Sequence, residues 1–288
     1  MSLDASISAP APRALDGRVA IVTGGNRGIG AAIALAFASA GADVAILARD
    51  MGAADGVARE IEQRGRAALA IHCDVTRAEQ VQTAVQRVLD RFGRLDVLVN
   101  NAGASPHDKP FLDISAQEWD AVIAVNLTGP ALMCRAAGPA LLRRSGASVI
   151  NIVSIAADTP IPGESVYSAA KAGLVSLTRS LAQEWSAEGV RVNAIAPGYV
   201  MTEINRGVWG LLVPYMDANG RVHPPESPPD EATRAALGVY ARTVSTTPLG
   251  RYGTPAEIAD LAVFLASDAA AFITGSTFYA DGGWQARR

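Results

Sequence analysis

Short apolar segments alternate along the chain with longer segments of helical periodicity. The short segments are apolar throughout rather than at every second position, which is typical of strands buried on both faces of a parallel sheet. They occupy residues 18–23, 43–48, 67–72, 95–100, 147–153, 190–195 and 277–280. Helices are expected near residues 28–40, 52–64, 77–92, 115–144, 167–187 and 255–267. The alternation predicts one α/β domain, a doubly wound parallel sheet of about seven strands with helices on both faces.

Two regions depart from this alternation. Residues 1–15 lack the basic start and the continuous apolar core of a secretion signal and are predicted to form a flexible tail. Residues 203–250 contain paired prolines and interrupt the last crossover, with a short helix expected from about Asp230. A stretch of that length in a compact domain is usually a functional lid or a disordered linker, and its position before the last long helix favours a substrate lid. The single domain is expected to span residues 16–288.

Composition narrows the classes of partner. With 49% hydrophobic and 18% charged residues the chain has the make-up of a globular protein, and its net charge of -3 argues against a nucleic-acid partner. Apolar runs such as the one from Ala31 stop short of the roughly 18 residues that span a bilayer, so no membrane segment is expected. Cys73 and Cys134 lack CxxC spacing, so they are expected to be buried free thiols, as in the cytoplasm, and no metal site is predicted.

A glycine-rich loop, "TGGNRGIG", follows the first strand and opens a helix. Gly24, Gly28 and Gly30 would let the backbone turn tightly and approach a pyrophosphate at the helix N-terminus. The spacing has three residues between the first two glycines, where GxGxxG has one, and the loop alone also fits a plain tight turn. Asp74, after the third strand, is placed either to accept a hydrogen bond from an adenine amino group or to cap the next helix.

A tyrosine and a lysine four residues apart, Tyr167 and Lys171, share one face of a helix. The chain has only one other lysine, Lys109. A nearby ammonium favours the phenolate and draws the pKa of a tyrosine down from about 10, which makes it usable as an acid and base. The alternative interpretation is an ordinary surface pair.

Two further polar residues occupy positions that indicate a functional site. Ser154 follows the fifth strand, at the carboxyl edge where open α/β sheets bind ligands, and its hydroxyl can hydrogen-bond a substrate oxygen. Asn126 lies in an apolar helix, where an amide is costly unless it has partners.

Together with "NNAG" (100–103) and "APGYVMT" (196–202), these motifs resemble, in order and spacing, the NAD(P)-dependent short-chain dehydrogenase/reductase family. The resemblance extends from about Asp16 to the terminal "ADGGW" and implies a Rossmann-like fold and a homotetramer. It implies Tyr167 as general acid/base, Ser154 polarising the carbonyl, Lys171 binding the nicotinamide ribose and lowering the tyrosine pKa, and Asn126 holding a water in a proton relay. The cofactor-binding residues that it implies are Gly24, Asn26, Arg27, Gly28, Ile29, Gly30, Arg49, Asp74, Val75, Asn101, Ala102, Gly103, Tyr167, Lys171, Pro197, Gly198, Val200 and Thr202.

The end of the second strand bears on the choice of cofactor. NAD-selective folds carry an acidic residue there for the ribose hydroxyls, about 20 residues after the glycines. Here that position is Ala48, followed by Arg49, and Arg27 lies inside the glycine loop. Two guanidinium groups favour the 2′-phosphate, so NADP(H) is the expected cofactor. A shift of one residue would bring Asp50 to the ribose, which leaves NAD(H) as the alternative.

The leading hypothesis is an NADPH-dependent enzyme that reduces a small-molecule ketone to a secondary alcohol, or the reverse. The alternative is a 3-oxoacyl-(acyl carrier protein) reductase, although the acidic insertion argues against docking of an acidic carrier. A remote alternative, a non-catalytic nucleotide-binding scaffold, is opposed by the intact catalytic residues. The substrate pocket is expected to be mainly apolar. It is expected to be bounded by residues 103–107 and 155–160, Tyr199, Val208, Trp209, Leu211, Leu212 and Tyr215.

Overall fold

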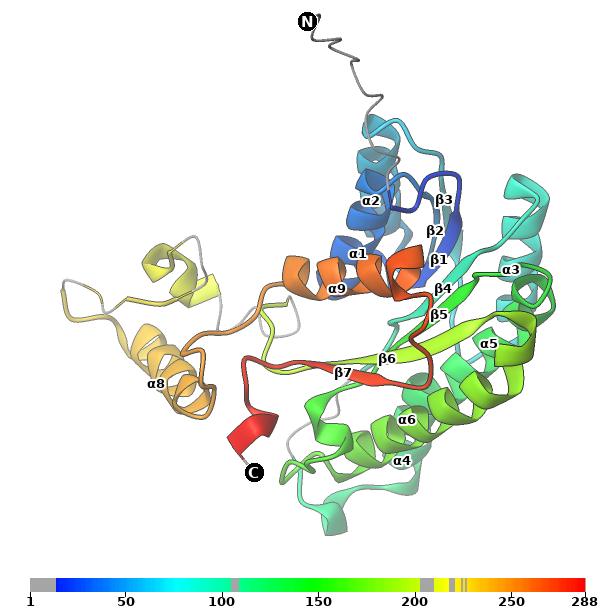
Figure 1. Cartoon of the computed structure of the whole chain (residues 1–288). Coiled ribbons are helices and arrows are strands. Elements are labelled where there is room, and N and C mark those ends of the chain that lie inside the picture. The colour runs from blue at the N-terminus through cyan, green and yellow to red at the C-terminus, as the bar shows by residue number, and fades with distance from the viewer. Residues whose placement is uncertain are drawn as a thin grey trace, which may run out of the picture.

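In a computed structural model of the chain, seven parallel strands form one sheet with the order β3-β2-β1-β4-β5-β6-β7 (Figure 1). The residues that the structure describes are 14–104, 109–202, 210–217, 221–223, 225 and 227–287. The strands are β1 (Val19–Thr23), β2 (Asp43–Ala48), β3 (Ala68–His72), β4 (Val97–Asn100), β5 (Ser148–Ile152), β6 (Arg191–Pro197) and β7 (Thr277–Ala280). This arrangement confirms the predicted doubly wound, Rossmann-like sheet.

Helices cover both faces of the sheet (Figure 1). One face packs against α1, α2 and α9, and the other against α3, α5 and α6. The bounds are α1 (Gly28–Ser39), α2 (Met51–Gln63), α3 (Ala78–Phe92), α4 (Ala116–Ile123), α5 (Gly129–Leu141), α6 (Ser165–Trp185), α8 (Glu231–Ser245) and α9 (Pro255–Ala266).

The strands are apolar at every position because each buries both of its faces. Val22 and Ile46 belong to the core beneath α1 and α9, whereas Ile21 and Leu47 belong to the core on the opposite face. Successive side chains of a strand point to opposite faces, so a sheet covered twice needs apolar residues throughout.

The helix predicted over residues 115–144 is wrong as a single α-helix. It is divided into α4, a π-helical turn at Ala124–Thr128, and α5. Pro130, in the first turn of α5, has no backbone N–H to continue regular α-helical bonding across this point. Such π-helical turns inside α-helices are frequent at functional sites, and Asn126 lies in this one.

The combined helical stretch Ala116–Leu141 is longer than the apolar runs that the sequence showed. Among the described residues it is the one helix long and apolar enough, by length and composition, to cross a membrane. It packs within the domain against α3, α6 and β4, and the core helix of a folded domain passes the same test.

The chain start bears on the predicted tail. Residues 1–13 lie outside the described residues. Leu15, which the prediction placed in the tail, is completely buried in the core beneath α1, and its backbone N–H donates to the Ala40 carbonyl at 2.9 Å. The packed domain therefore includes Leu15.

Part of the insertion folds around a small core of its own. Of residues 203–250, the positions 203–209, 218–220, 224 and 226 lie outside the described residues. The expected helix near Asp230 is α8, and Asp230 caps it by accepting a hydrogen bond from Thr233 N at 2.7 Å. Leu212, Ala236, Tyr240 and Tyr252 are buried together. Figure 1 shows α8 projecting from the sheet domain beyond α9.

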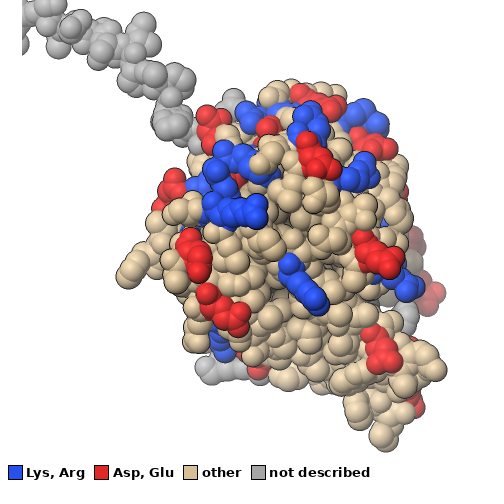
Figure 2. Space-filling view, turned by 90° about the vertical axis from the view of Figure 1, so that its right-hand side faces the viewer, with Lys and Arg blue, Asp and Glu red and all other residues tan. Residues whose placement is uncertain are grey.

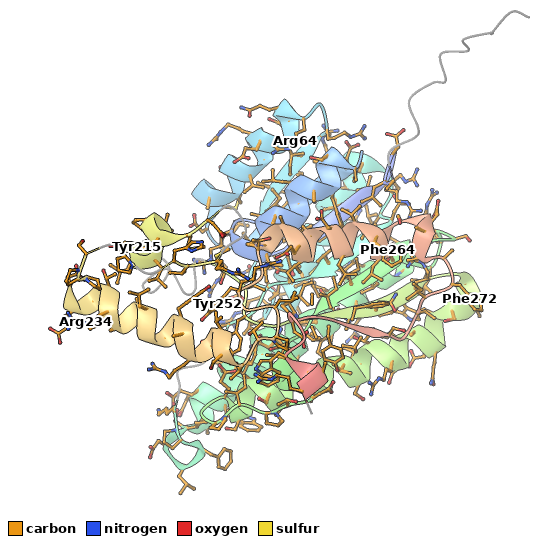
Figure 3. All side chains as sticks on the ribbon, turned by 60° about the vertical axis from the view of Figure 1, so that its left-hand side comes forward. Arg64, Tyr215, Arg234, Tyr252, Phe264 and Phe272 are labelled. Atoms are coloured by element: carbon orange, nitrogen blue, oxygen red, sulfur yellow. The ribbon has the colours of Figure 1, made fainter. Side chains whose placement is uncertain are left out.

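An aromatic stack joins this small core to the domain. Tyr252 stacks on Tyr240 with ring centroids 5.5 Å apart and meets Tyr199 edge to face at 5.8 Å. Tyr199 is the second residue after β6. Figure 3 shows Tyr252 between α8 and the sheet domain. The insertion is thus fastened to the segment after β6.

On another face of the molecule, basic and acidic side chains are interspersed (Figure 2). This face therefore presents mixed charge rather than one continuous basic patch.

Candidate active site

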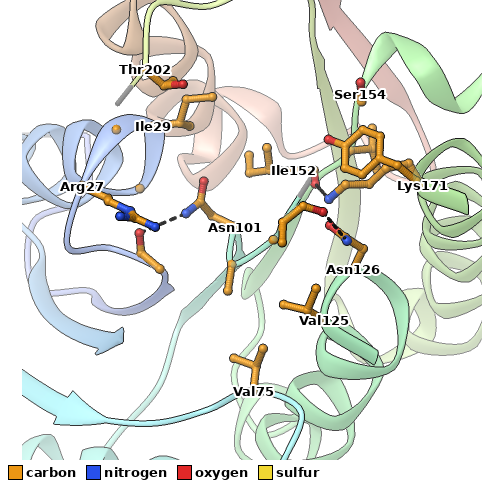
Figure 4. A pocket seen from close by; sticks show the side chains of 18 of the residues that line it. Arg27, Ile29, Val75, Asn101, Val125, Asn126, Ile152, Ser154, Lys171 and Thr202 are labelled. Carbon is orange, nitrogen blue, oxygen red and sulfur yellow. Dashed lines mark hydrogen bonds between the residues drawn. The ribbon is translucent and has the colours of Figure 1, made fainter. Parts of the chain in front are cut away.

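A pocket of about 890 Å3 runs along the carboxyl ends of β1, β2, β4, β5 and β6. The chain turns to opposite sides of the sheet after β1 and β4, which is where open α/β sheets bind ligands. All the catalytic and cofactor-binding residues predicted from the sequence line this one pocket, and Figure 4 shows several of them. Among the described residues, no three His, Cys, Asp or Glu side chains cluster as metal ligands.

The glycine loop forms a cradle that side chains would fill. Gly24 and Gly28 have positive φ angles of 62° and 53°. A Cβ at Gly30 would lie 2.2 Å from the Gly24 carbonyl oxygen, so this position excludes any side chain. No side chain of the described residues caps the N-terminus of α1, and its first turn carries no acidic residue. The free N–H groups and the helix dipole therefore fit a pyrophosphate.

The "NNAG" segment holds this loop in place. Asn101 Nδ2 donates to the carbonyl oxygens of Thr23 and Gly24, at 2.9 and 3.2 Å. The Thr23 hydroxyl oxygen accepts from the backbone N–H groups of Asn101 and Ala102, at 2.9 and 3.0 Å. Asn101 thus shapes the cradle through its amide, and Thr23 is a supporting residue that the sequence analysis missed. The sequence signal that could have identified Thr23 is a polar residue at the end of a buried strand.

The end of β2 lies at the adenosine end of the pocket. The strand ends at Ala48, and Arg49 is exposed beside it, as the sequence register predicted. Asp50 caps α2 by accepting a hydrogen bond from Ala53 N at 3.2 Å. The carboxylate of Asp50 is thus engaged with its own helix.

Asp74 also lines this end. Its carboxylate accepts from the backbone N–H and the hydroxyl of Thr76, at 3.0 and 2.8 Å, in a turn ahead of α3. Partial burial raises the pKa of Asp74, but the Thr76 hydrogen bonds and the charges of Arg49 and Arg77 outweigh it and lower the pKa below its ordinary value. The N-cap of α3 is Arg77, so the helix-cap alternative for Asp74 is wrong.

Ser154 and Tyr167 meet at the opposite end of the pocket. Ser154 follows β5 in an extended conformation, and its Oγ accepts from Ala156 N at 3.1 Å. The tyrosine hydroxyl is hydrogen-bonded to Ser154. Burial, together with the negative charge of Glu164, raises the pKa of Tyr167 to about 12, and the bond to Ser154 opposes this only in part. Tyr167 is therefore a phenol, a proton donor, at neutral pH.

Lys171 lies beneath this pair, one turn further along α6. Its side chain is 4% exposed, its Nζ donates to the Ile152 carbonyl oxygen at 2.9 Å, and it lies 5.5 Å from the centroid of the Tyr167 ring. Burial lowers the pKa of Lys171 to about 8. The expected lowering of the Tyr167 pKa is not present in this structure, because burial of the phenol dominates.

Asn126 is completely buried in the π-helical turn. Its Nδ2 donates to the carbonyl oxygens of Ala104 and Val122, at 2.8 and 3.0 Å (Figure 4). Its Oδ1 has no hydrogen-bond partner among the described residues. A Cβ at Gly103 would lie 2.8 Å from this oxygen and 3.6 Å from Lys171 Nζ, so both atoms border the same small space. An acceptor and a donor around one space fit the predicted water between Asn126 and Lys171.

The substrate end differs from the expectation in three respects, the first being that Ile155 alone of residues 155–160 lines the pocket. Leu212 is buried in the small core of the insertion rather than in the pocket, and Leu211 and Tyr215 do not line the pocket either. Glu164, which the sequence analysis missed, does line it. Its position three residues before Tyr167 was the available signal. His107, Val208 and Trp209 lie outside the described residues.

Comparison with known proteins gives consistent matches. The family model described as short chain dehydrogenase matches residues 18–209, and one described as Enoyl-(Acyl carrier protein) reductase matches residues 226–285. A D-threitol dehydrogenase of Mycolicibacterium smegmatis is 38% identical over 94% of both chains. A 3-oxoacyl-[acyl-carrier-protein] reductase of a Synechocystis strain is 40% identical over 94% of this chain and 98% of its own. A crystal structure of a putative short-chain alcohol dehydrogenase from Sinorhizobium meliloti is 36% identical and superposes with a TM-score of 0.83, over 96% of this chain and 99% of that one.

Proposed function

Because the chain belongs to the short-chain dehydrogenase/reductase family, we propose that it interconverts a ketone and a secondary alcohol with NADP(H), using Tyr167 as general acid and base. The chain is an oxidoreductase that acts on CH–OH and C=O groups. One observation carries the assignment of roles. A single pocket joins an anion-binding helix N-terminus to the hydrogen-bonded Ser154 and Tyr167 pair.

The chain's own residues account for the proton chemistry. The bound nicotinamide supplies or accepts the hydride. In the reducing direction, Ser154 and Tyr167 hold the carbonyl oxygen between their hydroxyl groups, and Tyr167 gives its proton to that oxygen as the alcohol forms. The ammonium of Lys171 stabilises the phenolate that remains. The phenolate regains a proton along the path bordered by Lys171 Nζ and Asn126 Oδ1. In the oxidising direction, the phenolate takes the alcohol proton.

The preference for NADP(H) rests on the adenosine end of the pocket. Arg27 and Arg49 are exposed there and line the pocket, and guanidinium groups bind phosphate with paired hydrogen bonds. Asp50, the residue that would select NAD(H), is occupied in capping α2. Both features support the phosphorylated cofactor.

A 3-oxoacyl-(acyl carrier protein) reductase is the second candidate, favoured by the Synechocystis relative and by the second family model. The D-threitol dehydrogenase relative instead points to a small polyol. The described part of the insertion carries three acids and three arginines, namely Asp217, Asp230, Glu231, Arg221, Arg234 and Arg242, and so lacks the excess of basic charge that would attract an acidic carrier protein. This favours a free small molecule as substrate, with neither nucleic acid nor membrane as partner.

A cytoplasmic homotetramer completes the proposal. Cys73 and Cys134 are both free and buried, which fits a reducing compartment. Large apolar side chains are exposed on α4 and on α9 and its following loop, namely Trp119, Phe264 and Phe272. Figure 3 shows Phe264 and Phe272 on the side away from the insertion. Such side chains are suited to contacts between subunits.

The test of the mechanism is Tyr167→Phe, which removes the proton donor and keeps the ring. We expect kcat/KM to fall by about 10²- to 10⁴-fold, because general acid catalysis contributes that much. Binding of NADPH, followed by its fluorescence, should persist. Turnover is followed by nicotinamide absorbance across a panel of ketones and alcohols with both cofactors. Tyr279→Phe, an exposed tyrosine on β7, serves as control and should leave turnover unchanged. A Tyr167→Phe enzyme within about threefold of wild type would show that the assignment is wrong.

A further inference from the structure

A carboxylate lines the catalytic end of the pocket, where an apolar lining was expected. Glu164 is the N-cap residue of α6, three residues before Tyr167, yet its side chain makes no capping hydrogen bond to the helix backbone. Among the described residues that line this end of the pocket, Glu164 is the one acidic side chain. Arg27 and Arg49 line the other end, beside the glycine loop and β2.

Glu164 lines the pocket together with two tyrosines, Tyr167 and Tyr199. Burial first, and then the charge of Glu164, raises the pKa of both Tyr167 and Tyr199. The first tyrosine belongs to α6 and the second to the segment after β6, and both line the pocket. Glu164 thus shares the lining of the pocket with Ser154, Tyr167 and Tyr199. Ile155 and Ile161 supply apolar lining there.

The distance is suited to recognition of a group beside the reacting carbon. Residues three apart at the start of a helix have Cβ atoms about 5 to 6 Å apart. Glu164 and Tyr167 thus enter the pocket from the same turn of α6, and a substituent beside a carbonyl bound at Tyr167 lies in the part of the pocket that Glu164 also lines. An ionised carboxylate only accepts hydrogen bonds, and those it accepts are stronger than neutral ones.

We propose that Glu164 selects substrates that carry a hydroxyl or ammonium group on the carbon next to the reacting carbon, and disfavours substrates with a carboxylate there. The selection acts by attraction to the donor and by repulsion of the like charge. This inference rests on the proposed function, because it names the substrate class of the same site.

The experiment measures binding of tertiary alcohols, which have no hydrogen on the carbinol carbon and cannot react. Four ligands share one dimethylcarbinol centre and differ in the neighbouring group. They are 2-methylbutan-2-ol, 2-methylpropane-1,2-diol, 1-amino-2-methylpropan-2-ol and 2-hydroxy-2-methylpropanoate. Calorimetry is carried out on the enzyme saturated with NADP⁺ or NAD⁺, whichever it binds. We expect wild type to bind the diol and the amino alcohol at least about tenfold more tightly than the carboxylate.

Three variants separate recognition from a structural role. In Glu164→Gln the ratio between the amino alcohol and the carboxylate should fall to within about threefold, because the charge is lost and an amide acceptor remains. Glu164→Asp keeps the charge and should keep the direction of the preference. Asp158→Asn removes an exposed carboxylate from the neighbouring 3₁₀ turn outside the pocket, and should leave the ratio unchanged. Thermal melting confirms that each variant is folded.

The outcomes are distinct. Any one of four results would overturn the proposal. Wild type could bind the ammonium and carboxylate ligands equally, or bind none of the four ligands. The affinity ratio could also stay unchanged in Glu164→Gln, or shift equally in Asp158→Asn. Failure of the proposed function gives a different result. The ligands would then be discriminated as expected, while the matching secondary alcohols and ketones show no turnover with either cofactor.

Discussion

Burial of a single side chain, Lys171, sets its pKa at this site. Its ammonium is almost completely removed from water and keeps a hydrogen bond to the Ile152 carbonyl. Burial opposes the charged form, so the pKa in the folded protein falls to about 8 from the ordinary 10.5. At neutral pH the lysine nevertheless carries its charge, as stabilisation of a phenolate requires.

This shift predicts how stability depends on pH. Between pH 8 and 10.5 the unfolded chain binds more protons at this lysine than the folded chain, so stability rises with pH. The cost of the buried charge is fully present below pH 8 and is lost above 10.5. In Lys171→Met this dependence disappears. We expect the difference in unfolding free energy, wild type minus variant, to increase by up to roughly 3 kcal/mol across that window.

Urea unfolding of the cofactor-free proteins at pH 7, 8, 9 and 10 measures this difference. Tyr167 is a further buried group with a displaced pKa, raised to about 12, and it destabilises the fold as pH rises from 10. Because it is present in both proteins, its contribution largely cancels. Stability curves that run parallel over the whole range would contradict the assignment of a buried, titrating Lys171.

At the scale of elements, the few residues after a strand decide what the sheet edge binds. The turn after β2 places Arg49 in the lining of the pocket and Asp50 at the N-cap of α2. The same register was expected from the sequence, because a buried strand ends where apolar residues give way to charge. We propose that this turn sets the choice of cofactor.

The double change Ala48→Asp with Arg49→Gln should reverse that choice. It places a carboxylate where the 2′-phosphate would lie, adding repulsion to the loss of an attractive guanidinium. We expect wild type to favour NADPH over NADH by about 10²-fold in kcat/KM, with the preference weakening in salt, and the double variant to favour NADH. Arg64→Gln, at the far end of α2, is the matched control and should keep the wild-type preference. A wild type that prefers NADH would mean that Arg49 does not bind the phosphate.

The α4–α5 region shows the limit of periodicity at this scale. Apolar spacing predicted one long helix, and the structure interrupts it with a π-helical turn. That turn points the Asn126 side chain to the Ala104 carbonyl and to the space beside Lys171. The amide in an apolar helix was a correct signal for a buried polar site, but the local backbone form depends on packing that a sequence pattern does not contain.

At the scale of the whole molecule, the insertion is a small body that an aromatic stack and hydrogen bonds to the C-terminal segment fasten to the sheet domain. Its core has few buried side chains compared with the two cores of the sheet, and small cores open more readily. We propose that it closes over the substrate. Amides of residues 210–217 and α8 should exchange hydrogen faster than those of β1, β4 and β5 in the free protein. They should gain protection with cofactor and substrate, while α3 amides change little. Equal exchange in both states would indicate a static feature.

The assembly is tested by light scattering after gel filtration. We expect a mass four times that of the chain, because the exposed apolar side chains on α4 and α9 would be covered in a tetramer. Phe264→Asp should lower the mass, since a charge is costly in an apolar contact. A monomer mass for wild type at micromolar concentration would contradict the proposed tetramer.

The sequence by itself determined the sheet and the main residues of the site. Strands buried on both faces must be apolar throughout, so they were visible without any tertiary information. Tyr167 and Lys171 are related by one helical turn, and the glycine loop by one strand-to-helix junction, so their geometry is local as well. Because such geometry depends only on residues that are close in the sequence, short motifs were sufficient to identify the family.

Tertiary structure alone decided what depends on residues distant in the chain. The pKa of Tyr167 rose instead of falling because burial, together with the charge of Glu164, outweighed the hydrogen bond to Ser154. Leu212 joined the core of the insertion instead of the pocket, because Tyr240 and Tyr252 pack beside it. Glu164 became a pocket residue only when the fold brought the start of α6 and the segment after β6 to the same pocket. Burial and electrostatic fields are sums over all neighbours in space, and a linear pattern does not specify those neighbours.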